Sequence, residues 1–316
     1  MKLPPQVFLE ITRACNQACP FCSCPWFRKD APPGGPELSI GEWREVASAL
    51  IGDGVRFIGV TGGEPTLKPG WEDLLFHLKA ELIRHDPEHH ELALYSNGKS
   101  FRPEWKPILE ECEAKLYLSL PGLASFAAQT GDPEDDFRRI IRLIGALEGI
   151  PVVAGVTVTK LSLPELYETL SYAVLAGAQG VVINLFKPFG GRGISHPELR
   201  LSDSDILLAA RTAETVAEKC GGAAFFGGEF PDFVRSEDFP HLALENRCIA
   251  AQGTFTVAPD GFIHVCEHDP EALCFWKERH RLEFDPRWRT FAGGAYTVCP
   301  LFGTLSRSGE SDIPEA

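Results

Sequence analysis

Short apolar runs alternate with longer amphipathic stretches over the first two thirds of the chain. The runs are rich in β-branched and aromatic residues and have the length of strands, whereas the stretches have the length of helices. Strands are predicted at 7–11, 56–61, 92–96, 115–120, 152–158 and 181–186. Helices are predicted near 39–51, 70–84, 104–113, 135–148 and 164–176. This alternation is typical of βα units built on a parallel sheet.

Parallel strands that are joined through helices by right-handed crossovers curl toward a barrel. The six predicted strands are fewer than the eight of a closed barrel. We therefore expect an α/β fold, an open partial (β/α)6 barrel of the TIM type, over residues 1–200. Functional residues are expected at the carboxyl ends of its strands.

The pattern changes after residue 200. A helix near 202–219 and a Gly- and Phe-rich stretch indicate a connecting helix and linker over 201–245. A β-hairpin is then predicted at 254–257 and 262–265, with Pro259-Asp260-Gly261 in its turn. We expect 246–303 to form a small second domain of hairpin and helix, and the polar tail at 304–316 to be disordered.

The composition and net charge exclude several classes of protein. The chain has 316 residues, of which 44% are hydrophobic, and a net charge of −14. This charge leaves no basic footprint for a nucleic acid, and no apolar run is long enough to span a membrane. The N-terminus carries no signal peptide, so we expect a cytoplasmic protein whose ten cysteines serve metal binding or catalysis rather than disulfides.

Two motifs follow the first two predicted strands. Cys15, Cys19 and Cys22 have the spacing C-x3-C-x2-C, and three thiolates this close can bind one face of an iron–sulfur cluster. A zinc site with Cys24 as fourth ligand, or scattered buried thiols, are the alternatives. The second motif is Gly62-Gly63-Glu64-Pro65, whose glycines let a ligand approach the backbone and whose carboxylate can accept from a cation.

Together the two motifs resemble the radical S-adenosylmethionine superfamily, and the resemblance extends over most of residues 6–195. It implies a 4Fe–4S cluster on the three cysteines, with S-adenosylmethionine (SAM) bound to the remaining iron. It also implies that Phe21 is the family's aromatic residue before the third cysteine. The segment 62–65 would receive the methionine ammonium, with Glu64 as the anionic acceptor.

Later strand ends carry further candidates for SAM binding. Ser96-Asn97 closes the third predicted strand and Ser119 the fourth, where the family commonly places polar side chains against the ribose. A turn and a satisfied hydroxyl are the alternatives. Lys187 and Arg192 flank a loop that resembles the family's Pro-x-Gly-Arg loop, where a cation meets the methionine carboxylate. Solvated surface charges are the alternative here.

A second cysteine pattern lies in the predicted hairpin. Cys248, Gly261 and Cys266 form C-x12-G-x4-C, which resembles the opening of the SPASM domain and of the shorter twitch domain. The resemblance implies one auxiliary 4Fe–4S cluster with Cys299 as a third ligand, and Gly261 is expected to adopt a positive φ at the turn. Cys274 is the first choice for the fourth ligand, with a distant residue, water or substrate as alternatives. For the whole set, a zinc site or core thiols remain open.

The resemblance implies that SAM is cleaved to a 5′-deoxyadenosyl radical, which takes hydrogen from a substrate C–H bond. A flavodoxin- or ferredoxin-like protein would donate the electron, and Cys24 or Cys274 is a candidate hydrogen donor unless it is an ordinary buried thiol. The expected substrate is a ribosomally made peptide that is cross-linked, epimerised or oxidised. About six residues precede the first predicted strand, so no leader-peptide-binding domain is expected there. An aminoglycoside-type sugar is the alternative substrate, and a non-catalytic iron–sulfur carrier or zinc protein is the alternative of another class.

Overall fold

The computed structural model describes residues 3–27, 35–132, 136–188, 191–220, 222–245 and 247–294. All the predicted parallel strands are present, and each pairs in parallel with the next along the chain. They are β1 (Gln6–Glu10), β2 (Phe57–Thr61), β3 (Glu91–Ser96), β4 (Lys115–Ser119), β5 (Val152–Val158) and β6 (Gly180–Leu185). The prediction of a partial barrel is confirmed.

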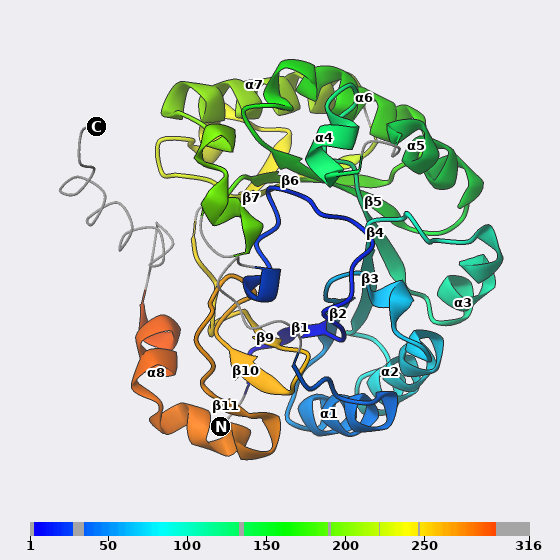
Figure 1. Cartoon of the computed structure of the whole chain (residues 1–316), viewed down its shortest axis with the longest axis vertical. Helices are drawn as coiled ribbons and strands as arrows, with labels where there is room; N and C mark the ends of the chain where they lie inside the picture. Colours follow the sequence, from blue (N-terminus) through cyan, green and yellow to red (C-terminus); the bar gives the residue numbers. More distant parts are fainter. Residues whose placement is uncertain are drawn as a thin grey trace.

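The crossover helices lie outside the curved sheet (Figure 1). They are α1 (Ile40–Gly52), α2 (Trp71–His85), α3 (Lys106–Glu111), α5 (Phe137–Ala146) and α6 (Leu166–Leu175). A short helix that the sequence did not predict, α4 (Phe126–Thr130), lies between β4 and α5. Within the described ranges, no helix has both the length and the apolarity that crossing a membrane requires.

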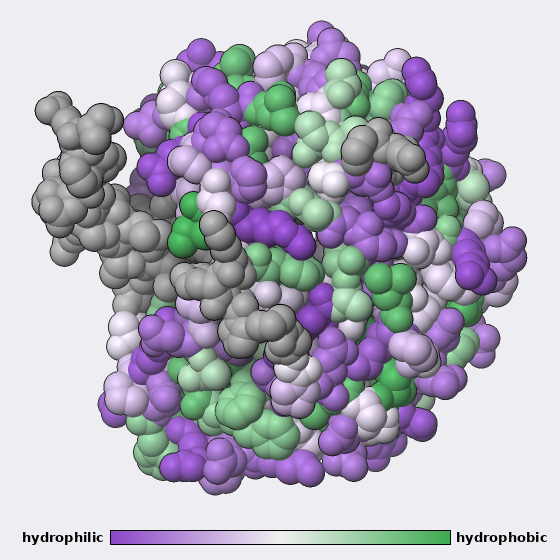
Figure 2. All heavy atoms as spheres, viewed as in Figure 1, coloured by the Kyte–Doolittle hydropathy of each residue, from purple (hydrophilic) through white to green (hydrophobic). Residues whose placement is uncertain are grey.

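The two faces of the sheet differ in character. On β1, Val7 and Leu9 are fully buried in the core with Trp43 of α1, so they face the helices. Because side chains alternate along a strand, Phe8 and Glu10 point to the inner face. The hydrophobic core therefore lies between sheet and helices, and the inner face carries polar and aromatic side chains. Figure 2 shows that polar residues also cover most of the surface in this view.

The predicted linker at 201–245 contains more regular structure than the sequence indicated. The predicted helix is α7 (Asp203–Cys220), and two further parallel strands follow it, β7 (Ala224–Glu229) and β8 (Leu242–Glu245). Glycines weaken a strand pattern in a sequence, because they add flexibility and no side chain to pack. The backbone of β7 instead pairs with the edge of β6, which local sequence does not reveal.

The predicted hairpin is confirmed as β9 (Thr254–Val257) and β10 (Phe262–His264), and Gly261 at its turn has a φ of +85°. The hairpin extends the main sheet, because β9 pairs in parallel with β1. The two-residue strand β11 (Cys274–Phe275) pairs with β10, and the 3-10 helix Trp276–Phe284 and α8 (Pro286–Gly293) follow. Cys299 and the tail at 304–316 lie outside the described residues.

The packing of β1 against the helices gives a test of the fold. Leu9→Ala removes a fully buried side chain from the sheet–helix core, and should lower the free energy of unfolding by about 2–5 kcal/mol. Leu175→Ala, at a position that is 82% exposed, should change it by less than about 0.5 kcal/mol. Denaturant unfolding of the two variants measures the difference, and equal losses would contradict this placement of the core.

Candidate functional site

The segment with Cys15, Cys19 and Cys22 has no helix or strand of its own, and it runs across the carboxyl ends of the barrel strands (Figure 1). Backbone hydrogen bonds hold it to three other loops. They are Gly63 N to Thr12 O (2.7 Å), Glu64 N to Ala14 O (2.7 Å), Ala18 N to Thr130 O (2.9 Å) and Gly193 N to Cys22 O (3.2 Å). We call residues 12–24 the cysteine loop.

Glycines make these contacts possible. A Cβ on Gly131 would lie 2.5 Å from the Ala18 carbonyl oxygen, and a Cβ on Gly63 or Gly191 would lie closer still to a carbonyl of the cysteine loop. Gly131 and Gly191 also have positive φ angles of +66° and +38°. No side chain fits between backbones that approach this closely, so glycine is required at all three places.

The three predicted cluster cysteines act on one another electrostatically. Burial raises the pKa values of Cys15 and Cys19, and the nearby Cys22 thiol adds to both shifts. A hydrogen bond from the Cys24 thiol lowers the pKa of Cys22 to about 7 and raises that of Cys24. Cys24 also donates to the Gly62 carbonyl oxygen at 3.8 Å. The loop therefore gathers four thiols beside the Gly62 turn.

Arg192 supplies positive charge to this group. Its charge opposes the burial-driven rise in the pKa values of Cys15 and Cys19 and adds to the lowering of the pKa of Cys22, and its guanidinium lies 4.2 Å from the ring centroid of Phe27. In the described ranges no three His, Cys, Asp or Glu side chains converge on a point where a single metal ion would sit. Three neighbouring thiols beside one guanidinium fit an iron–sulfur cluster, whose ligands are thiolates. Burial lowers the pKa of His268, and the charge of Lys187, which was predicted alongside Arg192, adds to this shift.

Glu64 connects the second motif to the end of β3. It is fully buried, and its Oε1 accepts hydrogen bonds from Thr66 N (3.2 Å), Thr66 Oγ1 (2.5 Å) and Ser96 Oγ (2.9 Å). Its Oε2 accepts from Asn97 N at 2.8 Å. Burial raises the pKa of this carboxyl, and the same hydrogen bonds oppose the shift. Contact with a SAM ammonium stays a prediction, whereas the structure shows that Glu64 holds two strand ends together.

Asn97 extends this connection to the cysteine loop. Its Nδ2 donates to Asn16 Oδ1 at 2.8 Å and approaches Cys15 Sγ at 3.8 Å. The predicted residues Glu64, Ser96 and Asn97 thus form one hydrogen-bonded unit beside a cluster cysteine.

The remaining residues predicted for the SAM site differ in burial and in backbone conformation. Pro65 is buried at the start of the 3-10 turn Pro65–Leu67, and Gly62 has a φ of +138°. Phe21 is half-buried in the cysteine loop. Ser119 is exposed at the end of β4.

The described C-terminal cysteines lie before, after and beside the β9–β10 hairpin. Cys248 is buried before β9, and Cys266 is half-buried after β10. Cys274 pairs with Ile263 and so shares a face with Val257, which points toward the core rather than the inner face. Burial raises the pKa of Cys274 to about 11, and the charges that act on it are Glu278, Asp285 and Arg281.

This register does not support the expected role of Cys274, either as fourth cluster ligand or as hydrogen donor on the inner face. Cross-strand partners point to the same side of a sheet, so Cys274 lies on the side of Ile263. Its distance of eight residues from Cys266 in sequence could not reveal on which face of the sheet the thiol would lie.

Sequence reasoning missed an ion pair between the hairpin turn and the cysteine loop. Arg13 Nη2 donates to Asp260 Oδ2 at 2.7 Å, and Leu38 N donates to Pro259 O at 2.8 Å. Glu37 accepts from Arg13 N at 2.7 Å and from Lys68 Nζ at 2.8 Å. The hairpin is thereby joined to both motif loops. No local signal marks these residues, because their partners are distant in the sequence.

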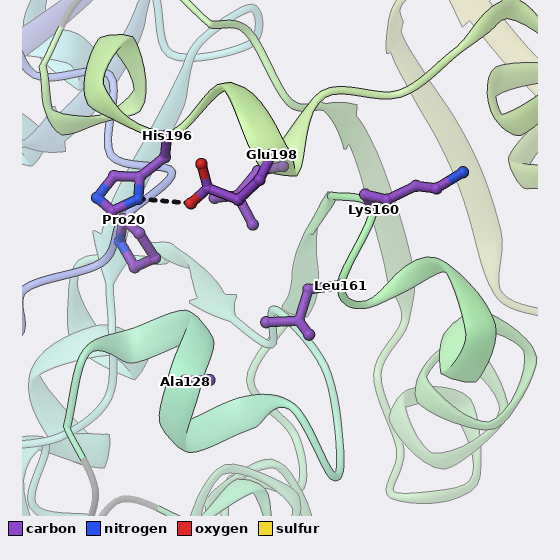
Figure 3. Close-up of a pocket in the computed structure, with 7 residues that line it drawn as sticks. Pro20, Ala128, Lys160, Leu161, His196 and Glu198 are labelled. Atoms are coloured by element: carbon purple, nitrogen blue, oxygen red, sulfur yellow. Dashed lines mark hydrogen bonds and ion pairs between the residues drawn. The ribbon is translucent and has the colours of Figure 1, made fainter.

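An open pocket of about 440 Å³ borders the cysteine loop (Figure 3). Its lining includes Pro20 of that loop, Leu161 after β5, and His196 and Glu198, which share a 2.8 Å hydrogen bond. Lys160 at the rim is paired with Asp205. The pocket adds an accessible surface next to the predicted cluster cysteines.

The family model described as the Radical SAM superfamily matches residues 9–173 of the chain. The PqqA peptide cyclase of Rhodopseudomonas palustris is 40% identical over 282 residues, which are 86% of this chain and 69% of that protein. The chain spans between 41% and 69% of the length of three curated relatives that it matches.

Two solved structures are similar to the chain in fold. Native anSMEcpe with bound AdoMet has a TM-score of 0.69 at 14% identity, and the match covers 94% of this chain and 87% of that one. SuiB of Streptococcus suis, bound to the precursor peptide SuiA, has a TM-score of 0.65 at 15% identity. That match covers 96% of this chain and 67% of that one.

The close contact between Gly131 and Ala18 gives a testable prediction about the shape of the cysteine loop. Gly131→Ala should displace Ala18 and lower the iron retained after anaerobic reconstitution. Gly177→Ala is the matched control, because its φ is also positive (+106°) but no atom lies within 4 Å of the added Cβ. Both variants should lose about 1–2 kcal/mol of stability through backbone strain, and iron analysis separates them. Equal iron in both would show that the close contact does not shape the loop.

The hydrogen bonds of Glu64 generate a second prediction. In Glu64→Gln an amide NH2 meets groups that are already donors, and the negative charge is lost. Because hydrogen bonds to a charged group are worth about 1.5–3 kcal/mol, SAM should bind roughly tenfold to a hundredfold more weakly. Calorimetry on reconstituted protein measures this, with exposed Asp73→Asn on α2 as the control. Unchanged affinity in the Gln variant would place Glu64 outside the SAM site.

Proposed function

The chain belongs to the radical SAM superfamily, and on that premise we propose that it cleaves SAM reductively and removes a hydrogen atom from a C–H bond of a ribosomally made peptide. The observation that carries the proposal is the cysteine loop, which places Cys15, Cys19 and Cys22 together across the strand ends, beside Arg192. A non-catalytic carrier has no need of the Gly62 turn and the Glu64–Asn97 unit next to those thiols.

When a 4Fe–4S cluster and SAM are bound, they supply the 5′-deoxyadenosyl radical that attacks the substrate. The three thiols would hold the cluster, and Arg192 would offset their negative charge. The Gly62 turn and Asn97 would hold SAM on the adjoining strand ends. The protein thereby determines which substrate hydrogen faces the radical, and positioning of this kind lowers the barrier of the step.

A peptide substrate is supported by the relative named PqqA peptide cyclase and by the fold shared with SuiB, which was captured with a precursor peptide. The net charge of −14 favours a basic partner, whether a peptide or an aminoglycoside-type sugar. We keep the peptide as the proposal, because 86% of the chain is aligned to the peptide cyclase. The electron is proposed to come from a flavodoxin- or ferredoxin-like protein.

We further propose one auxiliary cluster in the C-terminal part, on Cys248, Cys266 and Cys299. The β9–β10 hairpin supports it, because the turn at Gly261 reverses the chain between the first two of these cysteines. Cys274 is left out of the ligand set, because its register puts it on the side of Ile263.

The joint replacement of Cys15, Cys19 and Cys22 by Ala tests the enzyme proposal. With dithionite and SAM under anaerobic conditions, 5′-deoxyadenosine should form in the wild type and be lost in the triple variant. Circular dichroism should stay unchanged, because the thiols lie outside the sheet–helix core. Cys220→Ala should keep the activity. A triple variant that still forms 5′-deoxyadenosine would refute the assignment.

Iron content of the same triple variant tests the auxiliary cluster. Two cubane clusters correspond to about eight iron atoms per chain in the wild type, and about half of these should remain in the variant. The further loss of Cys248 and Cys266 should remove the rest. A triple variant that contains zinc or no metal would leave the C-terminal part as a structural element alone.

A further inference from the structure

Glu10 is a buried carboxyl that the proposed SAM chemistry does not use. It is 4% exposed at the carboxyl end of β1, opposite Thr61 of β2. Burial raises the pKa of Glu10, and the nearby Glu267 and Cys22 add to the rise. A carboxylate that has lost most of its contact with water is costly unless a partner compensates for it, so a cation on the inner face would stabilise Glu10.

Three aromatic rings lie on the same face of the sheet. Phe8 and Tyr95 meet edge to face with centroids 5.6 Å apart, and Tyr95 stacks on Tyr117 at 4.4 Å. Gly59 of β2 makes room for this, because a Cβ there would lie 2.7 Å from the Phe8 ring and 2.9 Å from the Tyr95 ring. Phe8 precedes Glu10 by two positions on β1, so the rings form an aromatic floor next to the carboxyl.

The charges around Glu10 are mainly negative. Glu267 is the strongest of them, and it also acts on Tyr95. The cation among these neighbours, Arg13, is already paired with Asp260 at 2.7 Å. A carboxyl beside aromatic faces in a negative field is the environment that an ammonium or guanidinium group prefers, through charge-assisted hydrogen bonds and cation–π contact.

We propose that Glu10 and the rings of Phe8, Tyr95 and Tyr117 form a subsite that binds a cationic side chain of the substrate. The inference rests on the proposed function, because it places the substrate on the inner face of the barrel. This is next to the cysteine loop, whose residues Cys22 and Cys24 interact electrostatically with Glu10. For a peptide, the substrate class is a segment with Lys or Arg close to the residue that reacts.

Two small probes test the subsite on the reconstituted holoenzyme with SAM. Calorimetry compares Nα-acetyl-lysine amide with its neutral counterpart, Nα-acetyl-norleucine amide. The wild type should bind the lysine probe at least tenfold more tightly. Glu10→Gln should weaken the lysine probe about tenfold to a hundredfold, since a charged hydrogen-bond partner is lost, and leave the norleucine probe unchanged.

Glu91→Gln is the matched control. Glu91 lies on the same face of the sheet as Tyr95, but at the start of β3 rather than near its carboxyl end, and it is paired with Lys115. Its replacement should not alter the preference for the lysine probe. Tyr117→Leu is a second, independent variant in case Glu10→Gln does not fold. This variant keeps the Glu10 carboxyl but removes one aromatic ring. The preference for the lysine probe over the norleucine probe should fall about two- to fivefold.

The outcomes separate the subsite from the proposed function. A wild type that forms no 5′-deoxyadenosine with dithionite refutes the proposed function, whatever the probes do. A wild type that forms it but binds both probes equally refutes the subsite alone. So does a folded, iron-loaded Glu10→Gln variant that keeps the preference for lysine.

Discussion

The cysteine loop keeps its shape through contacts between backbones, and every other part of the site is positioned relative to it. The loop has no secondary structure of its own, so hydrogen bonds from the ends of three neighbouring loops fix its path. Carbonyl groups of the loop approach Gly63, Gly131 and Gly191 more closely than any side chain permits. Rigid support of this kind is what a reactive centre requires, because small displacements of its ligands misdirect the chemistry.

The C-terminal hairpin belongs to the same support. It pairs with β1 through β9, and Asp260 at its turn holds Arg13, which lies two residues before Cys15. Glu37 and Lys68 connect the same place to the turn after β2. The hairpin of the expected second domain therefore also supports the loop that carries the three predicted cluster cysteines. The hairpin and the cysteine loop are thereby connected through one sheet and through one network of charges.

The sequence predicts the parts of this structure that depend on local patterns. Runs of β-branched residues locate β1 to β6, and the Pro-Asp-Gly turn locates the hairpin. Features that depend on partners far along the chain could not be predicted. From the sequence alone, the glycines of β7 predict a loop, whereas the segment is a strand that pairs with β6. Cys274 is close to Cys266 in the sequence, but the strand register puts its thiol on the side of Ile263. Glu64 was predicted for its charge, but its four hydrogen bonds show that it also joins two strand ends.

The pairing of β1 with β9 sets an order of events during synthesis. Gln6 lies beside Thr254, so β1 keeps an unpaired edge until nearly 250 further residues have been made. At about 5–20 residues per second, that interval lasts on the order of ten seconds to a minute. Throughout it, an apolar strand edge is available for wrong pairing, and Arg13 lacks its partner on the hairpin. The Arg13–Asp260 contact that supports the cysteine loop therefore forms only after translation has passed the hairpin, and the proposed metal site would be completed at that late stage.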